Sequence, residues 1–112
     1  MKTTQNIEPQ GEIEFPEFVK KLCKPGAVIC EELTPHDCNL LHMALGVSGE
    51  AGEVLDAVKK AVIYRKPLDR ENIIEEAGDI LFYLTGLLSA VGSSTKEAIR
   101  LNREKLRLRY VS

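Results

Sequence analysis

The chain has 112 residues, of which 44% are hydrophobic and 29% are charged, and its formal net charge is −2. This composition is ordinary for a globular domain, and a slightly acidic chain lacks the basic character of proteins that bind nucleic-acid polymers. No apolar run approaches the roughly 20 residues that span a bilayer, and the N-terminus has no basic-then-apolar export pattern. We therefore expect one cytoplasmic domain over residues 1–112, with neither a membrane nor a nucleic-acid polymer as partner.

The N-terminal third gives weaker signals than the rest. Residues 1–12 are polar and without periodicity, which predicts a flexible or loosely docked tail. Apolar residues spaced as on one helix face predict a short amphipathic helix from Glu14 to Lys24, which ends at the Pro-Gly pair that follows. Residues 27–33 fit either a brief extended piece or a further turn of helix. The three cysteines match neither a zinc site nor a disulfide framework, so we expect reduced, partly buried thiols.

A long helix is predicted to follow. Thr34 is a good N-cap, Pro35 suits the first helical position, and Asp37 stands where a capping box needs an acid. The helix runs to about Tyr64, or about 45 Å at the usual rise per residue. Three glycines spaced three residues apart interrupt it, and they predict either a ridge that allows close approach by a neighbour or a local kink: Gly46, Gly49 and Gly52.

Two further helices complete the chain. After a turn around Pro67, Asp69 is the expected cap of a helix from Arg70 to Val91, whose apolar second half should be the most buried element or a dimer contact. Ser94 opens another capping box and a last helix, which reaches about Arg107. No strand-like alternation is present. The predicted class is all-α, a four-helix bundle-like fold with the long second helix antiparallel to the third.

Two acidic pairs lie on the two central helices. Glu50 with Glu53, and Glu76 with Asp79, are each three residues apart and so share a helix face. A short turn makes the helices antiparallel, so both pairs can point into one space. Either pair alone is typical of a solvated helix face. Together, with glycines beside the first pair and apolar residues around the second, they favour a site for Mg²⁺ or Mn²⁺, which prefer carboxylate oxygens.

These same segments resemble a known family. GEAGEVLDAVKK from Gly49 and EAGDILFYL from Glu76 resemble the ExxE and ExxD motifs of MazG-like nucleoside triphosphate pyrophosphohydrolases, and NREKLRLRY from Asn102 is similar to the segment that often closes compact members. The resemblance covers about Asp37 to Tyr110. It implies an all-α hydrolase that clears surplus or non-standard nucleotides from the pool. Such an enzyme cleaves nucleoside or deoxynucleoside triphosphates to monophosphate and pyrophosphate with Mg²⁺, for which Mn²⁺ can substitute.

The resemblance also implies roles for individual residues. The catalytic metal ligands would be Glu50, Glu53, Glu76 and Asp79, and the substrate contacts would be Lys60, Asn102, Lys105 and Arg109. It implies a homodimer or homotetramer in which a site can draw on two subunits. Basic residues crowd the last helix, which suits a triphosphate with about four negative charges. The plain alternative is a solvated basic end that the helix dipole favours.

The sequence is also compatible with two other functions. The chain can be a non-catalytic helical interaction or regulatory module whose acids bind a basic partner, or a phosphohydrolase that acts on another phosphoanhydride or on a monophosphate. Core packing is the expected role of Phe82 and Tyr83, with base stacking as the alternative. His42 is expected to form a structural hydrogen bond or one to a metal ligand, with metal ligation as the alternative. Nothing in the sequence selects a base or a sugar.

Overall fold

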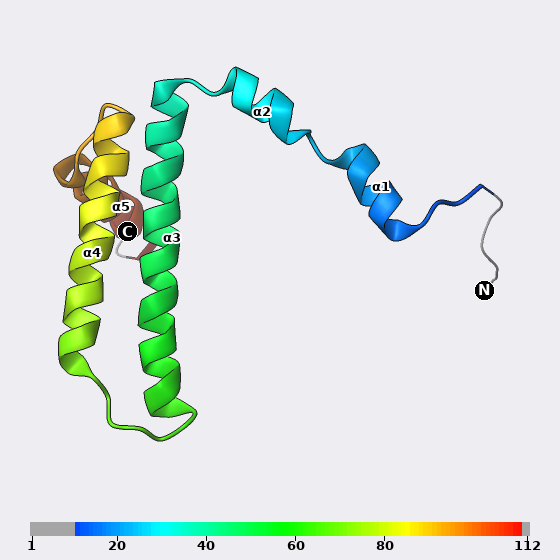
Figure 1. Cartoon of the computed structure of the whole chain (residues 1–112). Helices are drawn as coiled ribbons and strands as arrows, with labels where there is room; N and C mark the ends of the chain where they lie inside the picture. Colours follow the sequence, from blue (N-terminus) through cyan, green and yellow to red (C-terminus); the bar gives the residue numbers. More distant parts are fainter. Residues whose placement is uncertain (1–10, 111–112) are drawn as a thin grey trace. The chain divides into compact units, whose positions relative to one another are not determined.

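The computed structural model of the protein describes residues 11–110, which form five α-helices and no strand (Figure 1). The helices are α1 Phe15–Leu22, α2 Gly26–Glu32, α3 Pro35–Val62, α4 Arg70–Ala90 and α5 Thr95–Tyr110. The all-α class is confirmed. The chain divides into two compact units, one ending at Leu33 and the other beginning at Thr34. That the whole chain acts as one domain stays a prediction.

The first unit contains α1 and α2. In α1 the rings of Phe15 and Phe18 stack with their centroids 6.1 Å apart on the apolar face. The stretch that the sequence left open, residues 27–33, is mostly the helix α2. All three cysteines are exposed, so the expectation of partial burial was wrong. The tail predicted over residues 1–12 lies almost wholly outside the described residues.

The start of α3 is fixed locally by the predicted capping box. The Asp37 N–H donates to the Thr34 hydroxyl oxygen at 3.1 Å, and the Thr34 N–H donates to the Asp37 carboxylate at 3.0 Å. The hydrogen bond from the Thr34 backbone also lowers the pKa of Asp37 below its ordinary value. From this start the helix continues without interruption for 28 residues. Figure 1 shows no sharp bend in α3, so the ridge and not the kink describes the glycines.

A short connection turns the chain back from α3 into α4. Arg65 adopts a left-handed backbone conformation with φ 58°, and the Lys66 N–H donates to the carbonyl of Lys60 at 3.1 Å. This hydrogen bond satisfies one of the last carbonyls of α3. Asp69 then caps α4 by accepting a hydrogen bond from the Asn72 N–H at 3.1 Å. The predicted antiparallel arrangement of the long helix and its successor is confirmed (Figure 1).

Helices α3 and α4 pack closely at two glycines. A Cβ atom on Gly46 would overlap the ring of Tyr83, and one on Gly86 would overlap the sulfur of Met43. At Gly49 and Gly52 an added Cβ would meet nothing within 4 Å. The predicted small-residue ridge therefore faces α4 at only one of its three glycines.

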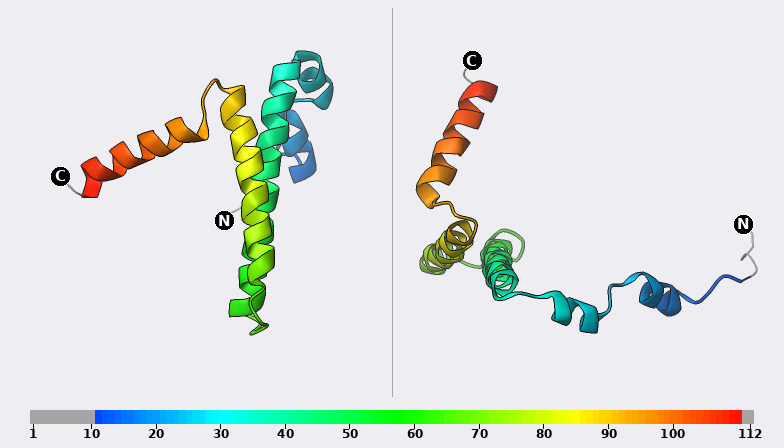
Figure 2. Two further views of the ribbon diagram at one scale, coloured as in Figure 1. Left: turned by 90° about the vertical axis from the view of Figure 1, so that its left-hand side faces the viewer. Right: turned by 90° about the horizontal axis from the view of Figure 1, so that it is seen from above.

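Helix α5 begins at its predicted cap but runs further than predicted, to Tyr110. The Glu97 N–H donates to the Ser94 hydroxyl at 3.1 Å, and the Glu97 carboxylate accepts a hydrogen bond from the Ser93 hydroxyl. Within residues 34–110, α5 contacts α4 but not α3, and it extends away from the α3–α4 pair (Figure 2).

No residue between 11 and 110 is fully buried in the single chain. On α3 and α4 large apolar side chains remain open, with Leu45 62%, Leu55 69% and Phe82 69% exposed. The second half of α4, expected to be the most buried element, is at best half-buried. The other expectation for it, contact with a second copy of the chain, stays a prediction. None of the described helices is long and apolar enough to cross a membrane.

Candidate functional site

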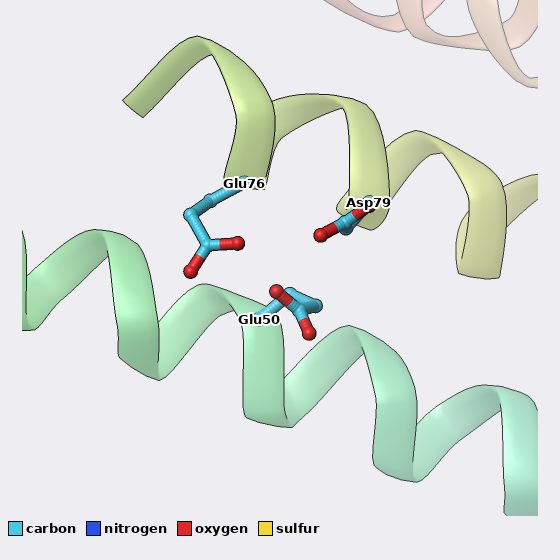
Figure 3. Close-up of side chains that lie close together, drawn as sticks. All are labelled: Glu50, Glu76 and Asp79. Carbon is cyan, nitrogen blue, oxygen red and sulfur yellow. The ribbon is translucent and has the colours of Figure 1, made fainter. Parts of the chain in front are cut away.

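Three of the four predicted acids converge between α3 and α4. Glu50 of α3, Glu76 of α4 and Asp79 of α4 each place a carboxylate oxygen within 4.8 Å of the other two. Figure 3 shows the three carboxylates turned toward one another across the space between the helices. Glu50 and Glu76 are half-buried and Asp79 is exposed. The antiparallel packing of two i,i+3 pairs produces this convergence, as the spacing predicted.

Glu53, the fourth acid, lies beside this group rather than within it. It does not join the mutual 4.8 Å set, but its side chain interacts with Glu76. A hydrogen bond with Glu50, partial burial, the charge of Glu50 and the interactions with Glu53 together raise the pKa of Glu76 to about 7. The pKa is raised because a proton on Glu76 relieves the repulsion between neighbouring carboxylates.

The three converging carboxylates, which we call the acidic cluster, have the chemistry of a divalent-cation site. All its donors are carboxylate oxygens, and no histidine or cysteine takes part in it. Hard ions such as Mg²⁺ and Mn²⁺ prefer such donors, with water or phosphate oxygens completing the coordination. A cation would also replace the proton that relieves the repulsion at Glu76. These residues therefore fit a Mg²⁺ or Mn²⁺ ion.

A cavity of about 380 Å³ lies at the turn end of the same helix pair. Glu53, Lys60, Lys66 and Asn72 are among its lining residues. Lys60, a predicted phosphate contact, forms an ion pair of 3.1 Å with Asp56 of the same helix. Sequence reasoning missed Lys66, although its place in the turn directly after the long helix was a signal that it would lie near Lys60.

The other three predicted substrate contacts lie on α5 and are exposed: Asn102, Lys105 and Arg109. The guanidinium of Arg109 lies over the Tyr110 ring, 5.9 Å from its centroid. Since α5 makes no contact with α3, the single chain does not bring this set to Glu50. A role of the α5 residues at the acidic cluster stays a prediction.

Aromatic rings lie one helical turn from the acidic cluster, on the side away from the cavity at the turn. The Tyr83 ring meets that of Phe82 edge-on, with centroids 5.3 Å apart, and approaches the ring of His42 at 6.2 Å. Packing was the expected role of Tyr83, and its ring does pack against α3 at Gly46. Phe82 remains largely exposed.

Comparison with known proteins identifies one family. The family model described as MazG nucleotide pyrophosphohydrolase domain matches residues 39–111, which is more than half of the chain. The match includes the acidic cluster, the cavity at the turn and all of α5. Searches among curated proteins and among solved structures gave no match.

Proposed function

The chain belongs to the MazG nucleotide pyrophosphohydrolase family, and we propose that it hydrolyses nucleoside or deoxynucleoside triphosphates to monophosphate and pyrophosphate with Mg²⁺. The observation that carries this proposal is the convergence of Glu50, Glu76 and Asp79 within 4.8 Å. Mn²⁺ suits the same oxygen donors and should substitute. A cytoplasmic location fits an enzyme that acts on the free nucleotide pool.

The proposed acids have two roles, metal coordination and proton transfer. We assign Glu50, Glu76 and Asp79 as ligands, with Glu53 at the edge of the acidic cluster as a further ligand or as the general base. The bound ion would draw phosphate oxygens together and lower the pKa of a water molecule. As that water forms a bond to the α-phosphorus, the Glu53 carboxylate would accept its proton while the bond to the bridging oxygen breaks and pyrophosphate leaves.

The phosphates need positive partners, and α3 and α4 supply few. Lys60 lines the cavity beside Glu53, and a phosphate oxygen could replace Asp56 as its partner. For Asn102, Lys105 and Arg109 we propose a homodimer or homotetramer that brings α5 of one copy to the acids of another. The exposed apolar side chains of α3 and α4 support this assembly, because a second copy would remove them from water.

The test is a product-resolved assay of the purified full chain with Mg²⁺ and each standard NTP and dNTP. We expect monophosphate and pyrophosphate in equal amounts, and loss of both when a chelator removes the metal. Release of orthophosphate would instead indicate attack at another phosphorus. No product from any substrate, together with a melting temperature that Mg²⁺ and a non-hydrolysable nucleotide leave unchanged, would favour a non-catalytic interaction module.

A further inference from the structure

At Gly46 of α3 the Tyr83 ring of α4 occupies the place that a side chain would take. The atoms nearest to an added Cβ would be Cδ1, Cγ and Cε1 of the Tyr83 ring, which move only with the whole ring and cannot swing away as the end of a flexible side chain can. At Gly86 the nearest group is the thioether of Met43, which is flexible. The rigid contact therefore lies at Gly46 and the adaptable one lies further from the acids.

These contacts and the acids share one register. In an antiparallel pair, a step forward along one helix matches a step backward along the other. Three residues before Gly46 is Met43, and three residues after Tyr83 is Gly86, which are the partners in the second contact. In the opposite direction, four residues after Gly46 is Glu50, and four residues before Tyr83 is Asp79. The same register therefore places Glu50 opposite Asp79. The acidic cluster is thus one helical turn from the Tyr83 contact.

We infer that Gly46 is a positioning residue for the acidic cluster. The missing side chain lets the Tyr83 ring lie against the α3 backbone, and this fixes the separation of the two helices beside Glu50. Helix separation depends on the side chains at the contact, so a methyl group here would push α3 and α4 apart where the carboxylates must share one ion. The inference rests on the proposed function, because it assumes that the carboxylates bind a divalent cation.

The neighbouring glycines provide matched controls. Gly49 directly precedes Glu50 in sequence, and Gly78 directly precedes Asp79, yet an added Cβ at either position would meet nothing within 4 Å. Replacing any helical glycine by alanine gives a similar gain in helix propensity. Differences between these substitutions therefore report the contact with α4 and not the loss of glycine.

The experiment measures Mn²⁺ affinity by calorimetric titration of the full chain, with circular dichroism to confirm helicity. We expect Gly46→Ala to weaken Mn²⁺ binding by about tenfold or more, the range found when groups that orient metal ligands are altered. Gly49→Ala and Gly78→Ala should bind as the wild type does. Equal affinity of Gly46→Ala and Gly49→Ala would overturn the inference.

A double-mutant cycle separates positioning from a general loss of stability. In a Tyr83→Ala background the overlap is gone, so Gly46→Ala should cost no further affinity. This double variant also carries the test if Gly46→Ala alone fails to fold, because it should fold and bind Mn²⁺ as Tyr83→Ala does. If the penalty persists without the ring, positioning through Tyr83 is wrong. A wild-type chain that binds no Mn²⁺ and releases no pyrophosphate would refute the proposed function as well.

Discussion

The α3–α4 pair and α5 carry the two parts of the proposed site, and they are held in different ways. Helices α3 and α4 pack along their lengths, and local features fix their relation: a capping box, a short turn and an Asp69 cap. Helix α5 has ordered caps and internal ion pairs, such as Arg100 with Glu104 at 2.9 Å, but it has no contact with α3. The first region is packed along its length within one chain, whereas the second touches only α4 among the described helices.

The acidic residues and the phosphate-binding residues of the proposed site differ in how the chain places them. The acids that would hold a cation already converge within one chain, to the extent that the pKa of Glu76 rises to about 7. Of the residues that would bind phosphate, Lys60 lies on α3. The other three, Asn102, Lys105 and Arg109, lie exposed on α5, which does not contact α3. We infer that the metal part of the site is formed on folding of the chain and the phosphate part on assembly.

The largest expected effect comes from the acids of the α3–α4 pair. Glu53→Gln should lower the rate of pyrophosphate release by about a hundredfold or more, because it removes the proposed general base or further metal ligand. Helicity and oligomeric state should be unchanged. Glu75→Gln, which alters an exposed acid next to Glu76, is the control and should retain activity. A variant at Glu53 that unfolds would instead point to a structural role for this acid.

The next effect tests whether α5 acts on another copy. Lys105→Ala should lower kcat/KM by about tenfold or more through loss of a charged contact to phosphate. Mixing chains that carry Glu53→Gln with chains that carry Lys105→Ala should then restore activity, to about a quarter of the wild-type value in randomly paired dimers. Measurement after subunit exchange provides the test.

Arg100→Ala is the matched control for the mixing experiment, because Arg100 is already paired with two acids of its own helix, Glu97 and Glu104. It should change kcat/KM little. If mixed chains exchange subunits yet stay inactive, both parts of the site belong to one chain, and α5 must reach α3 by moving within it.

The sequence predicts the α3–α4 pair well because its determinants are local. The caps at Thr34 and Asp69, and the spacing of the two acidic pairs, can be read without knowledge of packing. The three glycines of α3 could not be told apart in this way. Which of them faces α4 depends on the rotation of the helix about its own axis, and the structure selects Gly46 alone. The same rotation places Glu53 beside the acidic cluster instead of within it.

For helix α5 the sequence predicts less than it does for the α3–α4 pair. Its cap at Ser94 and its basic residues were predictable from the sequence. Its position relative to α3 and α4 was not, because no local pattern in its sequence specifies the surface that it contacts. The same holds for the stretch at residues 27–33, whose composition suits helix and extended chain alike and which the structure shows as α2. Where long-range contacts decide the outcome, local propensity leaves alternatives open.

A smaller effect should appear in the pH dependence of the metal-free protein. Glu76 has a pKa of about 7 when folded, against an ordinary value of 4.5. Between these values the folded state binds the proton and the unfolded state does not, so stability should be greatest below about pH 4.5 and fall as pH rises to about 7. Saturating Mg²⁺ should reverse this trend, because the ion needs the deprotonated carboxylates.

Melting temperatures at pH 5 and pH 8, with and without Mg²⁺, provide the measurement. Glu76→Gln is the control, since it removes the titrating group and should flatten the metal-free profile. The lowered pKa of Asp37 acts with the opposite sign, as its contribution is lost only when pH falls below the ordinary value of 3.8. A metal-free profile that rises from pH 5 to pH 8 would mean that the carboxylates do not converge in solution.

The smallest effect should come from the start of α3, far from the acidic cluster. Thr34→Ala removes the hydroxyl that caps the helix and should cost about 1 kcal/mol, which lowers the melting temperature of a domain of this size by about 4–8 °C. Thr34→Ser keeps the hydroxyl and should restore the wild-type value. Because Thr34 lies about 24 Å along the helix axis from Glu50, neither variant should change kcat at a temperature where both are folded. A loss of kcat in Thr34→Ala that Thr34→Ser restores would show that this end of α3 also takes part in the site. The site would then extend beyond the acids of α3 and α4 and the residues of α5.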